Sequence, residues 1–257
     1  MTILVALILG IVQGLTEFLP VSSSGHLALF SSLFNVETDF LLVSILLHLA
    51  TLLAVVFVFY KDIFYLLKHP FSKDAQKIYI ATIPTILIVL LFKGLIDKFF
   101  TNASILPFCF MLTAVLLFVT YIIEKKTKNI KQKEIKKSSA LAMGIAQGLA
   151  ILPGISRSGS TICTGLLLGE DKTSTAKFSF LMSIPIIIAS MIYEILFNGG
   201  GNALSEIGIL PLIISFVSAF IVGIFSIKFM LKIVEKAKYY YFSIYLVVIS
   251  ILSFFVI

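Results

Sequence analysis

The residue types best suited to chemistry lie in the segment Pro153–Thr161, whose sequence is PGISRSGST. It contains Arg157, the only arginine among 20 Lys and Arg residues, together with four hydroxyl side chains and two glycines. A guanidinium in apolar surroundings is unfavourable without a partner, and its planar fork fits the oxygens of a phosphate. The segment therefore predicts an oxyanion held inside a membrane.

A second group of polar side chains lies near the amino terminus. Gln13 and Glu17 are four residues apart in an otherwise apolar stretch, so they share one helix face. Glu17 could bind a divalent cation or act as a general base, and His26 could be an acid, a base or a nucleophile. The alternative for Glu17 is a purely structural ion pair with Arg157. His48, in the middle of an apolar run, predicts an interhelical hydrogen bond.

Serine clusters follow a Leu-Pro pair in both regions, at 22–24 and at 156–158. Serine is a favourable N-cap, so a short helix can begin at each cluster. Such a helix directs free N–H groups and the positive end of its dipole at an anion. The alternative is that these serines only cap their helices.

Membrane helices must position these groups. The chain is 59% hydrophobic and 13% charged, whereas a soluble domain carries about 25% charged residues. An apolar helix of about 20 residues crosses a bilayer. We expect an all-α polytopic membrane protein with full spans at about 40–60, 78–96, 104–123, 177–197, 207–227 and 240–257. The net charge of +7 does not indicate nucleic acid, because the lysines lie in loops that flank apolar spans.

Two shorter pairs of segments, 2–19 with 24–34 and 139–152 with 158–168, predict broken helix pairs. Each pair contains Gln-Gly-Leu, at Gln13 and at Gln147, followed by Leu-Pro and then by a cluster of Ser and Gly. The separation in sequence between Gln13 and Gln147 equals that between Ser22 and Ser156. We interpret this as two repeats, at about 1–124 and 139–257, joined by a cytoplasmic linker at about 125–138 within one membrane domain, 1–257. Chance similarity is the alternative. Three spans in each half make the second repeat inverted relative to the first.

The lysines support this topology. Seventeen of the 20 Lys and Arg residues lie in 61–77, 125–137, 172–177 and 228–238, which predicts a cytoplasmic side. The other side receives Lys93, Lys98, the acidic Glu37 and Asp39, and the lysine-free loop 198–206. The two broken pairs then enter from opposite sides and meet near the midplane, as in inverted-repeat transporters.

Both polar segments resemble motifs of the undecaprenyl-pyrophosphate phosphatases, also called bacitracin-resistance proteins. QGLTEFLPVSSSGH at 13–26 resembles the family's E/Q-x-x-x-E motif and the histidine after it, and PGISRSGST at 153–161 resembles its P-G-x-S-R-S-x-x-T motif. The resemblance extends to the length of the chain and the number of spans.

This resemblance implies a multi-pass phosphatase of the bacterial inner (plasma) membrane, with an active site that opens to the extracytoplasmic side. It would remove one phosphate from undecaprenyl diphosphate, which recycles the lipid carrier for peptidoglycan synthesis and confers resistance to bacitracin. It also implies a divalent cation, Mg²⁺ or Ca²⁺, held by Glu17 with Gln13. Many relatives have glutamate at the Gln13 position, and an amide is a weaker ligand than a carboxylate.

By motif position, the expected catalytic residues are Glu17, His26, Ser23, Ser156, Arg157 and Thr161. The expected substrate-binding residues are Ser22, Ser24, Gly25, Gly154, Ser158 and Gly159. The nucleophile is left open among Ser23, Ser156, His26 and water. The expected partners are the polyprenyl diphosphate and membrane lipids, without nucleic acid, and a homodimer is compatible with the sequence. The alternative function is a secondary transporter or lipid flippase, because inverted repeats and midplane breaks are also transporter features.

Overall fold

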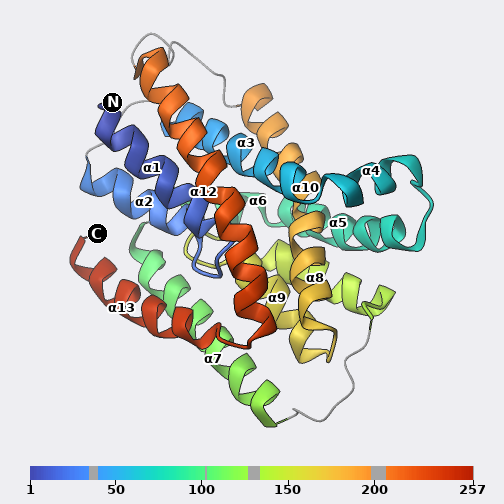
Figure 1. Cartoon of the computed structure of the whole chain (residues 1–257). Helices are drawn as coiled ribbons and strands as arrows, with labels where there is room; N and C mark the ends of the chain where they lie inside the picture. The colour runs from blue at the N-terminus through green and yellow to red at the C-terminus, as the bar shows by residue number, and fades with distance from the viewer. Residues whose placement is uncertain (35–39, 102, 127–133, 198–206, 257) are drawn as a thin grey trace.

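The computed structural model describes residues 1–34, 40–101, 103–126, 134–197 and 207–256, and these form helices without any strand (Figure 1). The all-α prediction is therefore confirmed for this part of the chain. Four of the described helices are long and apolar enough to cross a membrane. They are α5 (Lys73–Leu91), α7 (Leu106–Lys126), α10 (Lys172–Phe197) and α12 (Ile209–Glu235).

A fifth span is bent. Helix α3 (Phe40–Val58) continues into α4 (Tyr60–Lys68) after a bend of 83°. The sixth predicted span, α13 (Tyr240–Val256), is apolar but has 17 residues, which is below the ~20 that a straight crossing needs. The structure thus supports a multi-pass membrane protein with four or five full-length spans.

The two broken pairs lie where the sequence predicts them. The first consists of α1 (Ile3–Thr16) and α2 (Ser23–Leu33), and the second of α8 (Lys137–Leu149) and α9 (Arg157–Leu167). A proline lies inside each break, Pro20 in the first and Pro153 in the second. Proline disfavours helical geometry in the residue before it and offers no N–H group.

Two helices were not anticipated. The segment after Val58 was predicted as a lysine-bearing loop, yet α4 is helical, and α6 (Lys93–Thr101) follows α5. Helix α4 has no buried residue and combines charged with apolar side chains. This composition is typical of a helix in the plane of a membrane interface, and a search for long apolar runs does not detect it.

Glycines bring α1 and α8 close to their neighbours. Helix α1 packs on α12, and helix α8 packs on α5 (Figure 1). A Cβ added at Gly14 would lie 2.8 Å from the carbonyl oxygen of Ala219, and one at Gly144 would lie 2.6 Å from Cα of Ala81. Small residues allow such close packing of membrane helices. The pattern Gly-x-x-Gln-Gly occurs once in each proposed repeat, at 10–14 and at 144–148. It therefore has a packing role in both halves.

The lysine-bearing segments gather at one end of the molecule. Lys137 Nζ donates to Gln76 Oε1 at 2.7 Å, and Lys177 Nζ lies 2.7 Å from Asp62 Oδ1. Lys172, at the start of α10, forms an ion pair of 3.3 Å with a carboxylate at the end of α7. Residues 127–133 of the linker predicted at 125–138, as well as Glu37, Asp39 and the loop 198–206, lie outside the described residues.

Candidate active site

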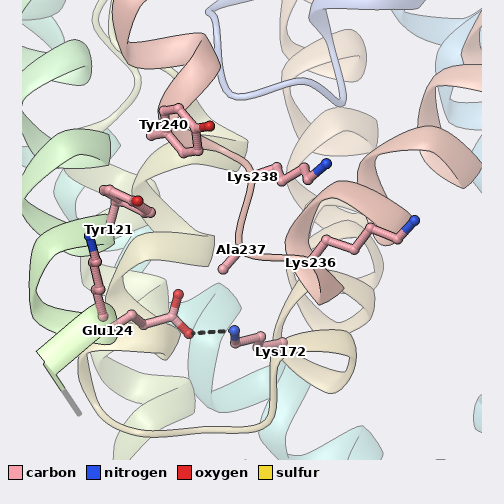
Figure 2. A pocket seen from close by; sticks show the side chains of 8 residues that line it. Tyr121, Glu124, Lys172, Lys236, Ala237, Lys238 and Tyr240 are labelled. Carbon is pink, nitrogen blue, oxygen red and sulfur yellow. Dashed lines mark ion pairs between the residues drawn. The ribbon is translucent and has the colours of Figure 1, made fainter. Parts of the chain in front are cut away.

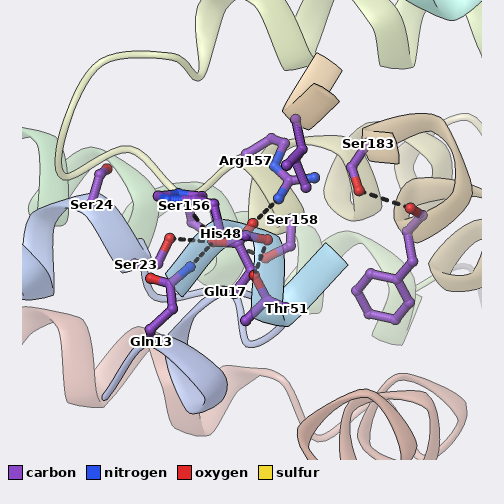
Figure 3. A network of polar contacts seen from close by, with 12 residues as sticks. Gln13, Glu17, Ser23, Ser24, His48, Thr51, Ser156, Arg157, Ser158 and Ser183 are labelled. Atoms are coloured by element: carbon purple, nitrogen blue, oxygen red, sulfur yellow. Dashed lines mark hydrogen bonds and ion pairs between the residues drawn. The ribbon is translucent and has the colours of Figure 1, made fainter. Parts of the chain in front are cut away.

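The carboxylate of Glu17, immediately after α1, is the centre of a polar cluster (Figure 3). Arg157 Nη2 donates to its Oε1 atom. The Oε2 atom accepts hydrogen bonds from Ser23 Oγ at 2.6 Å and from Gln13 Nε2 at 3.1 Å, and His48 Nε2 lies 3.8 Å away. The Glu17 side chain is 3% exposed, and that of Arg157 is 21% exposed. The cluster is therefore paired internally, but the guanidinium can still reach a ligand.

Four separate elements supply this cluster. Gln13 lies on α1, Ser23 begins α2, His48 lies on α3 and Arg157 begins α9. The two predicted motifs are thus brought together through side chains, as the sequence led us to expect. The alternative reading of Glu17, an ion pair with Arg157, is also correct as geometry, and it is compatible with a site.

The two breaks contact each other directly. Ser22 Oγ accepts a hydrogen bond of 3.1 Å from the backbone N–H of Gly154, and Ser158 Oγ donates to the carbonyl of Leu19 at 3.0 Å. Both Ser22 (φ 68°) and Gly154 (φ 90°) have positive φ angles, and this geometry is unfavourable for a serine. The contact between the breaks stabilises this strained backbone at the base of the site.

The capping alternative holds for two of the serines. Ser22 Oγ accepts from Gly25 N at 3.4 Å, and Ser156 Oγ accepts from Gly159 N at 3.0 Å, so each caps its helix. Ser24 Oγ is 3.4 Å from Ser22 Oγ and is partly exposed. The two breaks thus have matching caps, and the first turns of α2 and α9 retain N–H groups that can bind an anion.

The predicted glycines are required for close approach. A Cβ at Gly25 would lie 2.9 Å from Cα of Gly154, and a Cβ at Gly159 would lie 3.2 Å from Cβ of Pro20. Larger residues at Gly25 or Gly159 would separate the breaks, and a Cβ at Gly154 would lie 2.6 Å from Cβ of Cys109 on α7. These positions therefore shape the site, whether or not their backbone also contacts a ligand.

His26 is not among the described contacts of Glu17. It is 2% exposed, and its Nδ1 and Nε2 atoms lie 2.8 Å from Ser22 O and from the hydroxyl of Tyr245. The rings of His26 and Tyr245 are stacked, with centroids 5.7 Å apart. Both imidazole nitrogens are thus engaged in this state. Tyr245 of α13 was not anticipated, because a tyrosine in an apolar helix carries no distinguishing sequence signal.

Thr161 bonds to groups outside the Glu17 cluster. Its Oγ1 atom bonds to the carbonyl of Arg157 at 2.9 Å and lies 2.6 Å from the hydroxyl of Ser179 on α10, and the residue is fully buried. Ser156 donates its N–H to Thr113 Oγ1 on α7 at 3.1 Å. Both residues hold the start of α9 in place and make no described contact with Glu17.

His48 lies closer to the Glu17 carboxylate than the sequence indicates. Its Nδ1 atom is 2.8 Å from the carbonyl of Ser44, one turn earlier on the same helix. The predicted interhelical hydrogen bond is thus an intrahelical one, and the partner across helices is the Glu17 carboxylate. The signal that could have identified His48 was its imidazole in the middle of a long apolar run, as for Arg157.

The cluster has oxygens that fit a divalent cation. Gln13 Oε1 is buried and has no hydrogen-bond partner among the described residues, and it belongs to the residue that bonds to Glu17. Hard cations prefer carboxylate and amide oxygens. The described residues hold no group of three or more His, Cys, Asp or Glu side chains arranged for a metal. A cation on Gln13 and Glu17 would therefore take its other ligands from water or from phosphate oxygens.

Comparison with known proteins shows similarity over almost the whole chain. The family described as bacitracin resistance protein BacA matches residues 6–252. A protein of Carboxydothermus hydrogenoformans is 40% identical over 247 residues, which cover 96% of this chain and 94% of the relative. Relatives from Bacteroides fragilis (39% over 259 residues; 96% of each chain) and Treponema denticola (42% over 262 residues; 96% and 94%) are similarly close. All three are named undecaprenyl-diphosphatase.

Proposed function

This chain belongs to the bacitracin resistance protein BacA family, and on that premise we propose that it hydrolyses undecaprenyl diphosphate to undecaprenyl phosphate and inorganic phosphate. The observation that carries the proposal is the contact between Glu17, Arg157 and Ser23 where the two breaks meet. It combines an anion-binding cation, a hydroxyl and a carboxylate in one partly buried site. The reaction supplies the lipid carrier for peptidoglycan synthesis and accounts for bacitracin resistance.

Arg157 and the starts of α2 and α9 bind the diphosphate. The guanidinium can bind two phosphate oxygens at once, and the free N–H groups of both helices add further donors. In the present state Glu17 is the partner of Arg157, so an incoming diphosphate competes with the carboxylate for the guanidinium. Donors already in place stabilise the charge that develops on the phosphoryl oxygens.

Ser23 is the nucleophile best placed among the four considered. Its hydroxyl donates to Glu17 Oε2 at 2.6 Å, which is the geometry of a nucleophile beside its general base. Ser156 Oγ serves as an N-cap, and both nitrogens of His26 are engaged. A water molecule activated by Glu17 remains the competing nucleophile.

In the serine route, the reaction has two displacement steps at phosphorus. Ser23 Oγ attacks the terminal phosphorus, and its proton passes to Glu17. The bond from phosphorus to the bridging oxygen breaks, and its electron pair leaves with the lipid monophosphate. Water then attacks the phosphorus of the phosphoserine, and the bond from phosphorus to Ser23 Oγ breaks. Ser23 Oγ takes back the proton held by Glu17, and the protons of the water leave with inorganic phosphate.

Glu17 and Gln13 are the residues that would hold a divalent cation. When bound, Mg²⁺ or Ca²⁺ would polarise the phosphate oxygens and offset their charge. The unpaired Gln13 oxygen supports this assignment. Thr161 and the glycines of both motifs position the two breaks, and His26, whose two ring nitrogens are engaged, does not attack phosphorus.

The two halves are proposed to be inverted repeats within one membrane domain. Supporting contacts come in matching sets: α1 packs on α12 as α8 packs on α5, and α2 contacts α13 as α9 contacts α7. The lysine-rich end is then cytoplasmic by the positive-inside rule, and the site opens to the extracytoplasmic side of the inner membrane. A homodimer stays a prediction.

The transporter or flippase alternative is not favoured, because relatives that match nearly the whole chain are named as phosphatases. The deciding experiment is phosphate release from a prenyl diphosphate by purified protein, with and without EDTA, for the wild type and Arg157→Ala. Release that needs both a divalent cation and Arg157 supports the proposal. Absence of release by folded wild-type protein in several lipid and metal conditions would overturn it.

A further inference from the structure

A cavity lined by lysine and tyrosine side chains lies at the lysine-rich end, away from the Glu17 cluster. It has a volume of about 260 Å³ and lies between the end of α7 and the turn that joins α12 to α13 (Figure 2). None of its lining residues belongs to the site described above. The residues that matter for its chemistry are Tyr121, Lys125, Lys172, Lys236, Lys238 and Tyr240.

The cavity carries an excess of positive charge. Glu124 is its one acidic lining residue; its Oε1 atom is 3.3 Å from Lys172 Nζ, and its Oε2 atom accepts a hydrogen bond from Tyr239. Within the described part of the chain, Lys125, Lys236 and Lys238 have no carboxylate within 4.0 Å. The ion pair thus compensates one lysine and leaves three that can bind an anion.

Two of these three lysines lie on one turn of the chain. Lys236 and Lys238 lie on either side of Ala237, whose φ of 51° turns the chain sharply between α12 and α13. Figure 2 shows the ion pair of Glu124 and Lys172 below this turn. The hydrogen bond from Tyr239, in the same turn, to Glu124 at the end of α7 fixes the two walls relative to each other. The cluster is therefore organised by tertiary contacts.

Tyrosine side chains lie in and beside the cavity. The rings of Tyr121 and Tyr240 have centroids 4.7 Å apart, and those of Tyr240 and Tyr241 are 4.2 Å apart. Tyrosines gather at the boundary between the hydrocarbon core and water. Next to them, α7 and α13 expose apolar side chains such as Ile122 and Ile244, which acyl chains can cover.

We propose that this cavity binds the phosphate-bearing headgroup of an anionic phospholipid, with its acyl chains along α7 and α13. Basic pockets between membrane helices attract such headgroups, and each lysine near the surface strengthens the attraction. The tyrosine hydroxyls can donate further hydrogen bonds to phosphate oxygens. A free phosphate ion shares this chemistry but does not explain the level of the cavity beside apolar helix faces.

The test uses full-length protein in nanodiscs or detergent and measures retained lipid by native mass spectrometry. The probes are phosphatidylglycerol, phosphatidylcholine and inorganic phosphate. The pocket variant combines Lys125→Gln, Lys236→Gln and Lys238→Gln. The control variant combines Lys61→Gln, Lys68→Gln and Lys73→Gln, which removes the same charge from exposed positions outside the cavity.

We expect wild type and control to retain phosphatidylglycerol in preference to phosphatidylcholine, and the pocket variant to bind phosphatidylglycerol at least about tenfold more weakly. Equal losses of phosphatidylglycerol binding in both variants would mean that binding depends only on the overall positive charge, and this would overturn the proposal. Binding of inorganic phosphate without any preference for phosphatidylglycerol would also overturn it. All six lysines are away from the Glu17 cluster, so this result is independent of the proposed reaction.

Discussion

Arg157 and Glu17 form an ion pair although they are 140 positions apart in the sequence. One residue begins α9 and the other follows α1, so the pair joins the two breaks of the fold. The pair explains how a buried carboxylate and a lone guanidinium are both tolerated among apolar helices. It also defines where the phosphate must enter, because the guanidinium is the more exposed member.

Replacement of Arg157 should nearly abolish phosphate release. Arg157→Ala removes the main cationic group of the site, and we expect kcat/KM to fall by at least ~10²–10³-fold. Arg157→Lys should recover little of this loss, because an ammonium cannot reproduce the bidentate fork. Phosphate release from a prenyl diphosphate measures both variants. Near-wild-type turnover by folded Arg157→Lys protein would contradict the bidentate role.

The serines should separate into two classes. Ser23→Ala should lower kcat by about 10²-fold or more, because it removes the hydroxyl beside Glu17. Ser156→Ala removes an N-cap and should reduce the free energy of unfolding by about 1 kcal/mol. Ser32→Ala, at the exposed far end of α2, is the matched control and should keep kcat close to that of the wild type. If Ser23→Ala retains full kcat, water is the nucleophile.

The amide at position 13 should weaken the binding of a divalent cation. Gln13→Glu supplies a second carboxylate next to Glu17, and we expect half-maximal activity at a lower Mg²⁺ concentration. Gln13→Met has a similar volume without an oxygen and should need a higher concentration. Titration of Mg²⁺ into EDTA-treated protein gives both values. An unchanged Mg²⁺ requirement in both variants would remove Gln13 from the cation site.

Tyr245 should orient His26. Tyr245→Phe keeps the stacked ring and removes the hydroxyl that bonds to His26 Nε2 at 2.8 Å. We expect kcat to fall by about tenfold, with a changed pH profile, because the imidazole loses one of its two fixed hydrogen bonds. Tyr241→Phe, in the same helix but outside the site, is the control. Identical pH profiles for Tyr245→Phe and wild type would limit Tyr245 to packing.

Close helix packing should make Gly14 sensitive to a single methyl group. A Cβ there would lie 2.8 Å from the carbonyl of Ala219, so Gly14→Ala should lower the free energy of unfolding by about 1–3 kcal/mol. Gly94 in α6 has nothing within 4 Å of an added Cβ, and Gly94→Ala should be neutral or slightly stabilising. Thermal unfolding of the two variants in the same detergent tests the contrast.

The helical membrane class and the positions of both breaks follow from the amino-acid sequence. Apolar runs of membrane-spanning length admit few other folds, and Leu-Pro followed by Ser and Gly ends one helix and begins another. Arg157 and Glu17 stood out for the same reason, since ionisable groups are rare among apolar residues. The sequence does not predict helices α4 and α6, because their apolar stretches are too short to span a membrane.

Which polar side chains contact each other depends on the packing of the helices, and the sequence does not show it. Ser22 and Ser23 are neighbours in the sequence, yet Ser23 bonds to Glu17 and Ser22 caps α2. The sequence predicts only an interhelical hydrogen bond for His48, but its imidazole lies beside the Glu17 carboxylate. His26, predicted as catalytic, has both ring nitrogens engaged with Ser22 and Tyr245. Local sequence sets helix ends and faces, which depend on neighbours in the chain. Contacts between helices depend on how those faces pack, and the close approach at glycines of α1 and α8 sets that geometry.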